Sequence, residues 1–141
     1  MIARTLAKRI ADLMISKKAY DVVILDLKKL TSAADYFVIC TADSDTQVRA
    51  VADAVRDGME ESDERVWHDE GYQALKWIIL DYVDVVAHIF YKEDRSFYNL
   101  ERLWGDAKKT EVKDLTAAPK LAVKKGRTTT RTSKKKKAEK E

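Results

Sequence analysis

The segment from residue 77 to residue 104 constrains the fold of this 141-residue chain more than any other part of the sequence. It opens with two apolar runs, residues 77–80 and 85–91, which are rich in β-branched and aromatic side chains. Such runs on either side of a short polar connection predict adjacent strands of one sheet, joined as an antiparallel hairpin. Large apolar residues then recur at helical spacing and predict a helix after the hairpin: Phe97, Leu100, Leu103 and Trp104.

Two further segments have the periodicity of amphipathic helices. Residues 2–18 place their apolar side chains on one stripe, with basic and acidic residues between them. A second helix is expected from residue 44 to about residue 61, with Ser44 as its N-cap and Gln47 at the capping-box position.

The other apolar runs predict strands. Residues 21–27 and 36–41 are almost continuously apolar, which is typical of central strands covered on both faces. A short edge strand is expected at residues 66–67. Strands and helices mixed in this order predict a single α/β domain over residues 1–115, with a mixed sheet of about five strands flanked by helices.

The C-terminal segment, residues 116–141, has a different composition. It contains ten Lys or Arg and two Glu, a net charge of +8, whereas residues 1–115 have 17 basic and 22 acidic groups, a net charge of −5. No large apolar residue follows Val123, so nothing there offsets the entropy of ordering the chain. We expect an acidic folded domain and a disordered basic tail.

Two features bear on the cellular compartment. The single cysteine, Cys40, lies in an expected strand and is predicted to be a small buried hydrophobe. No apolar run approaches the ~20 residues that cross a bilayer, and charged residues interrupt the N-terminus where a signal peptide would be apolar. The sequence therefore favours a cytoplasmic protein with no membrane partner.

The sequence offers little for catalysis or for a metal. His68 precedes two acidic residues and is expected in a solvated polar turn before Gly71. His88 falls within the second hairpin strand, where a partly buried histidine with satisfied hydrogen bonds is expected. No second histidine or cysteine stands at metal-ligand spacing, and no glycine-rich phosphate loop is present. We expect no metal and no cofactor.

Several blocks of residues together resemble one protein family, the ribosomal silencing factors of the Iojap family. The matching blocks stand in the family's order and spacing: residues 35–40, 44–53, 70–71, 77–90 and 95–104. Two positions depart from the family pattern, since Val83 and Ala42 stand where it usually has glycine. Both weaken the expectation of tight turns there, because glycine tolerates positive φ.

The resemblance implies a fold similar to that of nucleotidyltransferases and a function in translational repression. Such factors bind the large ribosomal subunit through a ribosomal protein on its intersubunit face and block joining of the small subunit. An enzymatic alternative is a nucleotide-handling transferase that uses Asp43 and Asp45, although such enzymes need a glycine that is missing here. A third hypothesis is a general RNA-binding module led by the basic tail.

Aromatic and acidic residues of the segment 77–104 are the candidate binding residues. Large aromatic anchors with an acidic rim suit a basic protein partner, and the alternative is that the aromatics are core and the acids a solvated edge. We expect an auxiliary contact of the tail with ribosomal RNA, and the resemblance implies possible homodimers when the protein is free. The residues predicted to bind the partner are Trp77, Asp81, Tyr82, Asp84, His88, Tyr98, Asn99, Glu101 and Trp104.

Overall fold

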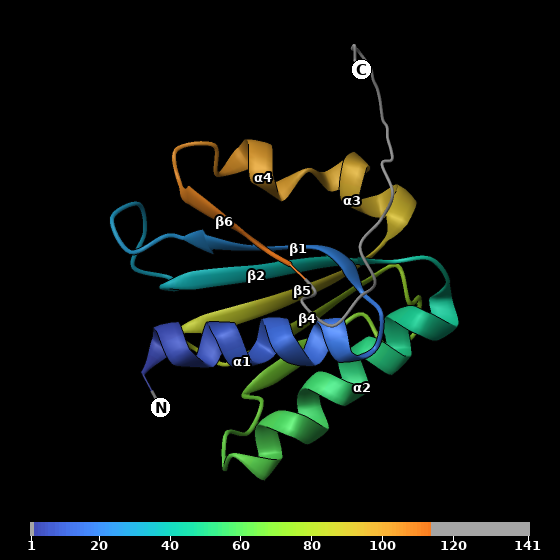
Figure 1. Cartoon of the computed structure of the whole chain (residues 1–141). Helices are drawn as coiled ribbons and strands as arrows, with labels where there is room; N and C mark the ends of the chain where they lie inside the picture. The colour runs from blue at the N-terminus through green and yellow to red at the C-terminus, as the bar shows by residue number, and fades with distance from the viewer. Residues whose placement is uncertain (1, 114–141) are drawn as a thin grey trace.

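The computed structural model describes residues 2–113, so the boundary expected at residue 115 and the basic tail of residues 116–141 lie outside the described residues. Figure 1 shows helices on both sides of one twisted sheet. The elements in chain order are α1 (Ala3–Ser16), β1 (Tyr20–Asp26), β2 (Tyr36–Ala42), α2 (Asp45–Glu61), β3 (His68–Glu70), β4 (Trp77–Asp81), β5 (Val85–Tyr91), α3 (Lys92–Tyr98), α4 (Leu100–Leu103) and β6 (Lys108–Val112).

The sheet has the strand order β3-β4-β5-β2-β1-β6. Strands β2 and β5 pair in parallel at its centre. The pairs β3–β4, β4–β5, β1–β2 and β1–β6 are antiparallel. The expected α/β domain with a mixed sheet and an antiparallel hairpin over residues 77–91 is therefore confirmed, with six strands in the described residues instead of about five.

One face of the sheet packs against α1 and α2 and forms the larger core (Figure 1). Alternate strand residues point to this face because side chains alternate along a strand. In β2 these are Val38 and Cys40, and in β5 they are Ala87 and Ile89, all of them fully buried. The expectation that Cys40 is a buried hydrophobe is confirmed.

The opposite face is covered only in part, by α3 and α4 (Figure 1). A smaller core lies there, built from β1, β2 and β5 residues together with Leu100. Leu100 is the one buried residue of these two helices, because α3 buries none of its residues. The α3–α4 segment therefore rests on the sheet with little buried apolar surface of its own.

The helix expected over residues 97–104 is wrong in its bounds. The chain is helical already from Lys92, where Glu93 and Asp94 in the first turn suit the positive end of the helix dipole. Asn99 then adopts the left-handed conformation, with φ of 46°, and separates α3 from α4. Asn tolerates this conformation better than most residues, and its side chain caps α4 by accepting from the backbone N–H of Arg102.

Two edge strands also differ from expectation. The edge strand expected at residues 66–67 lies at β3, so the polar turn expected around His68 is wrong. Strand β6 was not expected, because its sequence, KKTEV, is polar. Four of its five residues are exposed in the structure. Lysines on an edge strand discourage pairing with further chains.

Two tight turns depend on positive φ. Gly71 has φ of 96°, and a Cβ atom there would lie 2.0 Å from the carbonyl oxygen of Trp77, so no other residue fits. Val83, in the hairpin loop, has φ of 75°. The backbone N–H of Asp84 donates to the carbonyl of Tyr82 across Val83, which is the hydrogen bond of a γ-turn. This positive-φ form is rare and strained, more so for a β-branched residue.

Helix α2 begins as its sequence predicts. The Ser44 hydroxyl accepts from the backbone N–H of Gln47 at 3.1 Å, as an N-cap does. The Gln47 side chain reaches back to the N–H of Asp43, one residue before the cap. Among residues 2–113, no helix combines the length and the apolar character that crossing a membrane requires.

Candidate partner-binding surface

Six aromatic rings gather on the sheet face that α1 and α2 leave free, and we call them the aromatic cluster: Phe37, Trp77, His88, Phe90, Tyr98 and Trp104. Trp77 lies at its centre, with ring centroids 4.9 Å from Phe90 and 4.7 Å from Tyr98. Phe37 joins the cluster through edge contacts, at 4.4 Å from His88 and 6.0 Å from Trp104. Such offset and edge-to-face pairs stabilise the arrangement beyond the burial of area alone.

His88 is the buried polar member of the aromatic cluster. Its side chain is almost fully buried in β5, and its Nδ1 accepts from the Trp77 indole N–H at 3.1 Å. The proton of the neutral ring therefore lies on Nε2, which has no hydrogen-bond partner among the described residues. Burial lowers the pKa of His88 to about 3. The expectation of satisfied hydrogen bonds is met at one ring nitrogen and not at the other.

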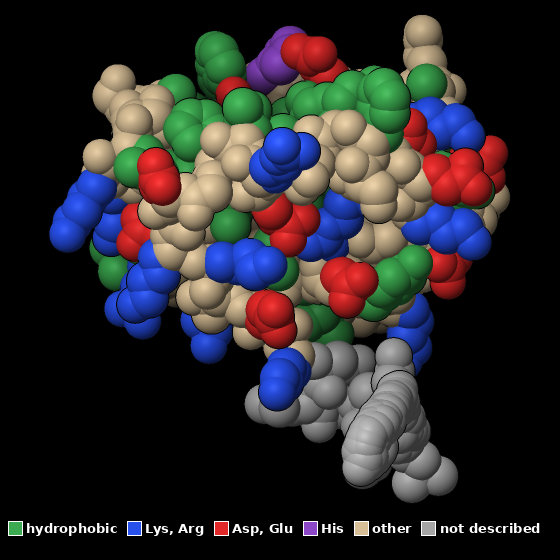
Figure 2. Space-filling view, turned by 90° about the horizontal axis from the view of Figure 1, so that it is seen from above, with side chains coloured by type: hydrophobic (Ala, Val, Ile, Leu, Met, Phe, Trp, Pro, Cys, Tyr) green, Lys and Arg blue, Asp and Glu red, His purple; other side chains and the backbone are tan. Residues whose placement is uncertain are grey.

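The aromatic cluster reaches the surface along α3 and α4. Tyr98 is 47% exposed, and its neighbours Phe97 and Leu103 are 79% and 72% exposed. Trp77 and Trp104 are half-buried beneath this edge. Figure 2, which views the molecule from above Figure 1, shows hydrophobic side chains gathered in a band along one margin of this face, beside acidic groups and a histidine. Large apolar side chains exposed together are typical of interaction sites.

The predicted acidic residues are placed in two different settings. Asp84 is exposed in the hairpin loop, and its backbone carbonyl accepts from the N–H of Asp35. Asp81 is half-buried, and its carboxylate accepts from the N–H of Val83 within the same loop. Glu101 lies apart from both and pairs with Arg95 and Lys109. Of these three carboxylates, only that of Asp84 therefore has no hydrogen bond or ion pair in the described part of the chain.

Glu101 is held ionised by its neighbours. Burial raises the pKa of its carboxyl, but the hydrogen bond and charge of Arg95, together with Lys109, outweigh this and leave the pKa lowered. Asn99, also predicted to bind the partner, is exposed at the break between α3 and α4.

Tyr82 is placed away from the aromatic cluster. It is 8% exposed and belongs to the larger core beneath α1 and α2. Burial raises the pKa of its hydroxyl, which has no hydrogen-bond partner among the described residues. Its predicted contact with a partner stays a prediction that this placement does not favour.

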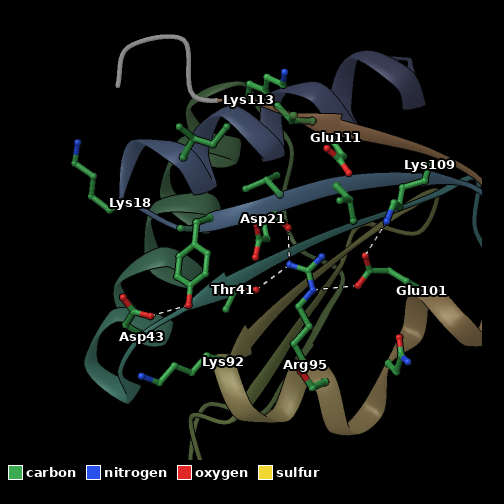
Figure 3. A pocket seen from close by; sticks show the side chains of 18 residues that line it. Lys18, Asp21, Thr41, Asp43, Lys92, Arg95, Glu101, Lys109, Glu111 and Lys113 are labelled. Carbon is green, nitrogen blue, oxygen red and sulfur yellow. Dashed lines mark hydrogen bonds and ion pairs between the residues drawn. The ribbon is translucent and has the colours of Figure 1, made fainter. Parts of the chain in front are cut away.

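The sequence did not point to Arg95, which lies at the centre of a cleft of about 1280 Å³ (Figure 3). Its Nη1 donates to the backbone carbonyl of Asp21 and, at 2.8 Å, to the Thr41 hydroxyl. Its Nε donates to Glu101 at 3.1 Å. An arginine between Asp94 and Ser96 in the sequence gives no sign of these partners, because they lie up to 74 positions away.

The carboxylates of the enzymatic alternative are engaged in local structure. Asp43 accepts from the Tyr20 hydroxyl at 2.7 Å, and this hydrogen bond, together with burial and the nearby carboxylates, raises the pKa of Tyr20 to about 12. Asp45 accepts from the backbone N–H of Thr46 in the first turn of α2. Within residues 2–113, no three His, Cys, Asp or Glu side chains gather as metal ligands would. This geometry gives no support to two-metal chemistry at Asp43 and Asp45.

Solved structures share this fold. A crystal structure of a Chromobacterium violaceum protein superposes with a TM-score of 0.73 at 29% identity, covering 82% of this chain and 97% of that one. A crystal structure from Bacillus halodurans gives a TM-score of 0.69 at 34% identity, covering 77% of this chain and 99% of that one.

Sequence comparison identifies the family. The chain is 45% identical over 91 residues to the ribosomal silencing factor RsfS of Bacillus subtilis, which covers 64% of this chain and 77% of that protein. It is 36% identical over 95 residues to the chloroplastic protein Iojap of Zea mays, covering 67% of this chain and 41% of that protein. The family model described as "Ribosomal silencing factor during starvation" matches residues 2–141. The chain therefore belongs to the ribosomal silencing factors, a family associated with the ribosome and with the regulation of translation.

Proposed function

We propose that this protein represses translation by binding the large ribosomal subunit and preventing the small subunit from joining it, without turning over a substrate. The observation that carries the proposal is the aromatic cluster, which α3 and α4 cover only in part and which reaches solvent at Tyr98. Aromatic anchors in a packed, partly exposed patch are the residues that most often dominate the energy of an interface. The family supplies the ribosome as the partner.

The partner surface that fits is basic. Residues 1–115 have a net charge of −5, and the exposed carboxylate of Asp84 lies in the loop that joins β4 to β5. We propose that this acidic surface meets a basic ribosomal protein on the intersubunit face of the large subunit. Complementary charge accelerates the encounter and fixes its orientation, while the aromatic anchors supply most of the affinity.

Steric exclusion follows from size. A compact domain of this length has a radius of gyration of about 13 Å, so a docked copy stands well clear of the surface it covers. The two ribosomal subunits must approach to contact distance across their shared face. A folded domain on that face is enough to hold them apart, and no catalytic group is needed.

The remaining parts of the proposal concern the tail, the location and the free protein. We propose that the domain ends near residue 115 and that the basic residues of 116–141 add a contact with ribosomal RNA, since lysines bind phosphate without regard to sequence. We place the protein in the cytoplasm, where its ribosomal partner would be. The exposed apolar residues on α3 and α4 would support self-association when no ribosome is bound.

The test is sedimentation of the purified full-length protein with separated ribosomal subunits through a sucrose gradient. We expect co-migration with the large subunit and none with the small subunit. The protein's own nucleotide-hydrolysing or nucleotide-transferring activity is measured in the same preparation and should be absent. Co-migration with the small subunit alone, or with neither, would refute the proposed function.

A further inference from the structure

The α3–α4 segment carries the exposed part of the aromatic cluster but has few apolar contacts with the sheet. Leu100 is its only buried residue, and α3 contributes none. Tyr98 and Trp104, the members of the aromatic cluster that lie in or next to these helices, keep part of their surface exposed. Apolar attachment of this segment is therefore limited to Leu100 and to the partly buried rings of Tyr98 and Trp104, which leaves a large share of its placement to polar contacts.

Arg95 supplies the missing attachment. Its guanidinium donates from α3 to the Thr41 hydroxyl in β2 and to the Asp21 carbonyl in β1. Figure 3 shows the side chain reaching from its helix into the cleft toward both strands. The side chain is only 13% exposed, and hydrogen bonds of a charged donor shielded from water are stronger than those at the surface.

Strand β1 is shaped to accept this contact. Its pairing with β2 is irregular between Tyr20 and Val23, and Asp21 in this bulge has φ of 50°. A bulge leaves a residue out of the regular ladder and can redirect its groups. Here the Asp21 carbonyl is turned into the cleft, where it accepts from Arg95.

The same guanidinium also ties the two helices together. Its Nε donates to Glu101 in α4 across the break at Asn99. Glu101 in turn pairs with Lys109 in β6 at 3.5 Å. One arginine therefore links α3 to β1, β2 and α4 directly, and to β6 through Glu101.

We propose that Arg95 is a positioning residue for ribosome binding, which holds α3 and α4 in the orientation that presents the aromatic cluster to the large subunit. This inference rests on the proposed function. Without Arg95 the segment opens locally while the rest of the domain stays folded. The apparent affinity then falls in proportion to the fraction of molecules in which the segment is still docked.

The test compares Arg95→Met with wild type by amide hydrogen exchange and by affinity for the large subunit. We expect faster exchange of the backbone amides of residues 96–104, unchanged exchange in β2 and β5, and binding weaker by about tenfold, as for a segment docked in about a tenth of the molecules. Arg95→Lys keeps the charge but cannot span all three acceptors, so it should recover only part of the affinity.

Two further variants make the result unambiguous. Arg102→Met removes an exposed arginine of the same segment whose side chain has no hydrogen bond or ion pair among the described residues, and it should leave the exchange unchanged. Glu101→Gln keeps the shape of the residue and weakens its links to Arg95 and to Lys109, while the contacts of Arg95 with Thr41 and Asp21 remain. It should accelerate exchange less than Arg95→Met does, and it serves if Arg95→Met does not fold.

The outcomes separate this inference from the proposed function. Unchanged exchange of residues 96–104 in Arg95→Met, or faster exchange with full affinity, would overturn the role of Arg95. If wild type binds the large subunit and the variants bind equally well, only the positioning role fails. If wild type does not bind, the proposed function fails and the role of Arg95 fails with it.

Discussion

Acidification should destabilise the domain through His88, the buried imidazole of the aromatic cluster. Burial lowers the pKa of His88 to about 3 in the folded protein, whereas an unfolded chain gives histidine its ordinary pKa of about 6.5. Between these two values the unfolded state binds a proton that the folded state does not bind. The stability that comes from the neutral ring is therefore complete above pH 6.5 and is lost as the pH falls toward 3.

The size of the effect follows from the two pKa values. Between pH 7.5 and pH 5 the linkage amounts to about 2 kcal/mol of unfolding free energy. Few carboxylates with ordinary pKa values titrate in that interval, so the histidine should dominate it. A loss of this size is a substantial part of the free energy of unfolding of a typical domain, which is about 5–15 kcal/mol.

The assay is urea denaturation at pH 7.5 and pH 5 for wild type and for two variants. His88→Asn keeps an acceptor for the Trp77 indole N–H but cannot take up a proton, so its stability should change by about 2 kcal/mol less than that of wild type between the two pH values. His68→Asn removes the other histidine, which is exposed and lies outside the aromatic cluster, and it should keep the loss of stability that comes from His88. Equal pH dependence of wild type and His88→Asn would refute the reasoning.

Four further predictions concern the hairpin, the surface and the tail. Val83→Gly relieves a φ of 75° and, after the entropy that glycine loses on folding, should stabilise by about 0.5–1 kcal/mol in thermal unfolding; a lower melting temperature would contradict it. Tyr98→Ala should weaken large-subunit binding by ~2 kcal/mol in an equilibrium assay with little change in melting temperature; if stability and affinity fall together, Tyr98 is a core residue and not a binding residue. Asp84→Lys should slow association at low salt and matter less at high salt in stopped-flow measurements, so a rate that does not change at low salt would refute steering. Deleting residues 116–141 should keep the melting temperature and flatten the salt dependence of affinity; loss of all binding at physiological salt would make the tail the main attachment.

Apolar periodicity was enough to predict most of the fold. The strands β1, β2, β4 and β5 are continuous apolar runs, and β-branched residues in such runs leave little choice but a buried sheet. The cap of α2 at Ser44 was also predictable, because a capping side chain acts on the backbone only a few residues away in the sequence.

Elements set by distant contacts were not predictable from local sequence. Strand β6 is polar and forms because β1 offers it an edge. The break at Asn99 depends on a left-handed backbone that a helical spacing of apolar residues conceals. The burial of the candidate residues was not predictable either. Tyr82 and Tyr98 look alike in the sequence, but Tyr82 is buried in the larger core and Tyr98 is exposed.

Arg95 shows the limit most clearly. Its partners are a backbone carbonyl in a bulge, a threonine hydroxyl and a glutamate, which come from three different elements. Nothing in the spacing of these residues brings them together before the sheet forms. A network of this kind can be recognised only from the folded structure.

Subunit joining, followed by light scattering, tests the central claim most directly. The protein is added first to large subunits, first to small subunits, or last to joined ribosomes, with Trp77→Ala as a variant that lacks the central ring of the aromatic cluster. We predict that preincubation with large subunits blocks joining most strongly, that joined ribosomes are left intact, and that Trp77→Ala blocks joining poorly while remaining folded. Full joining in the presence of wild-type protein bound to large subunits would contradict the account.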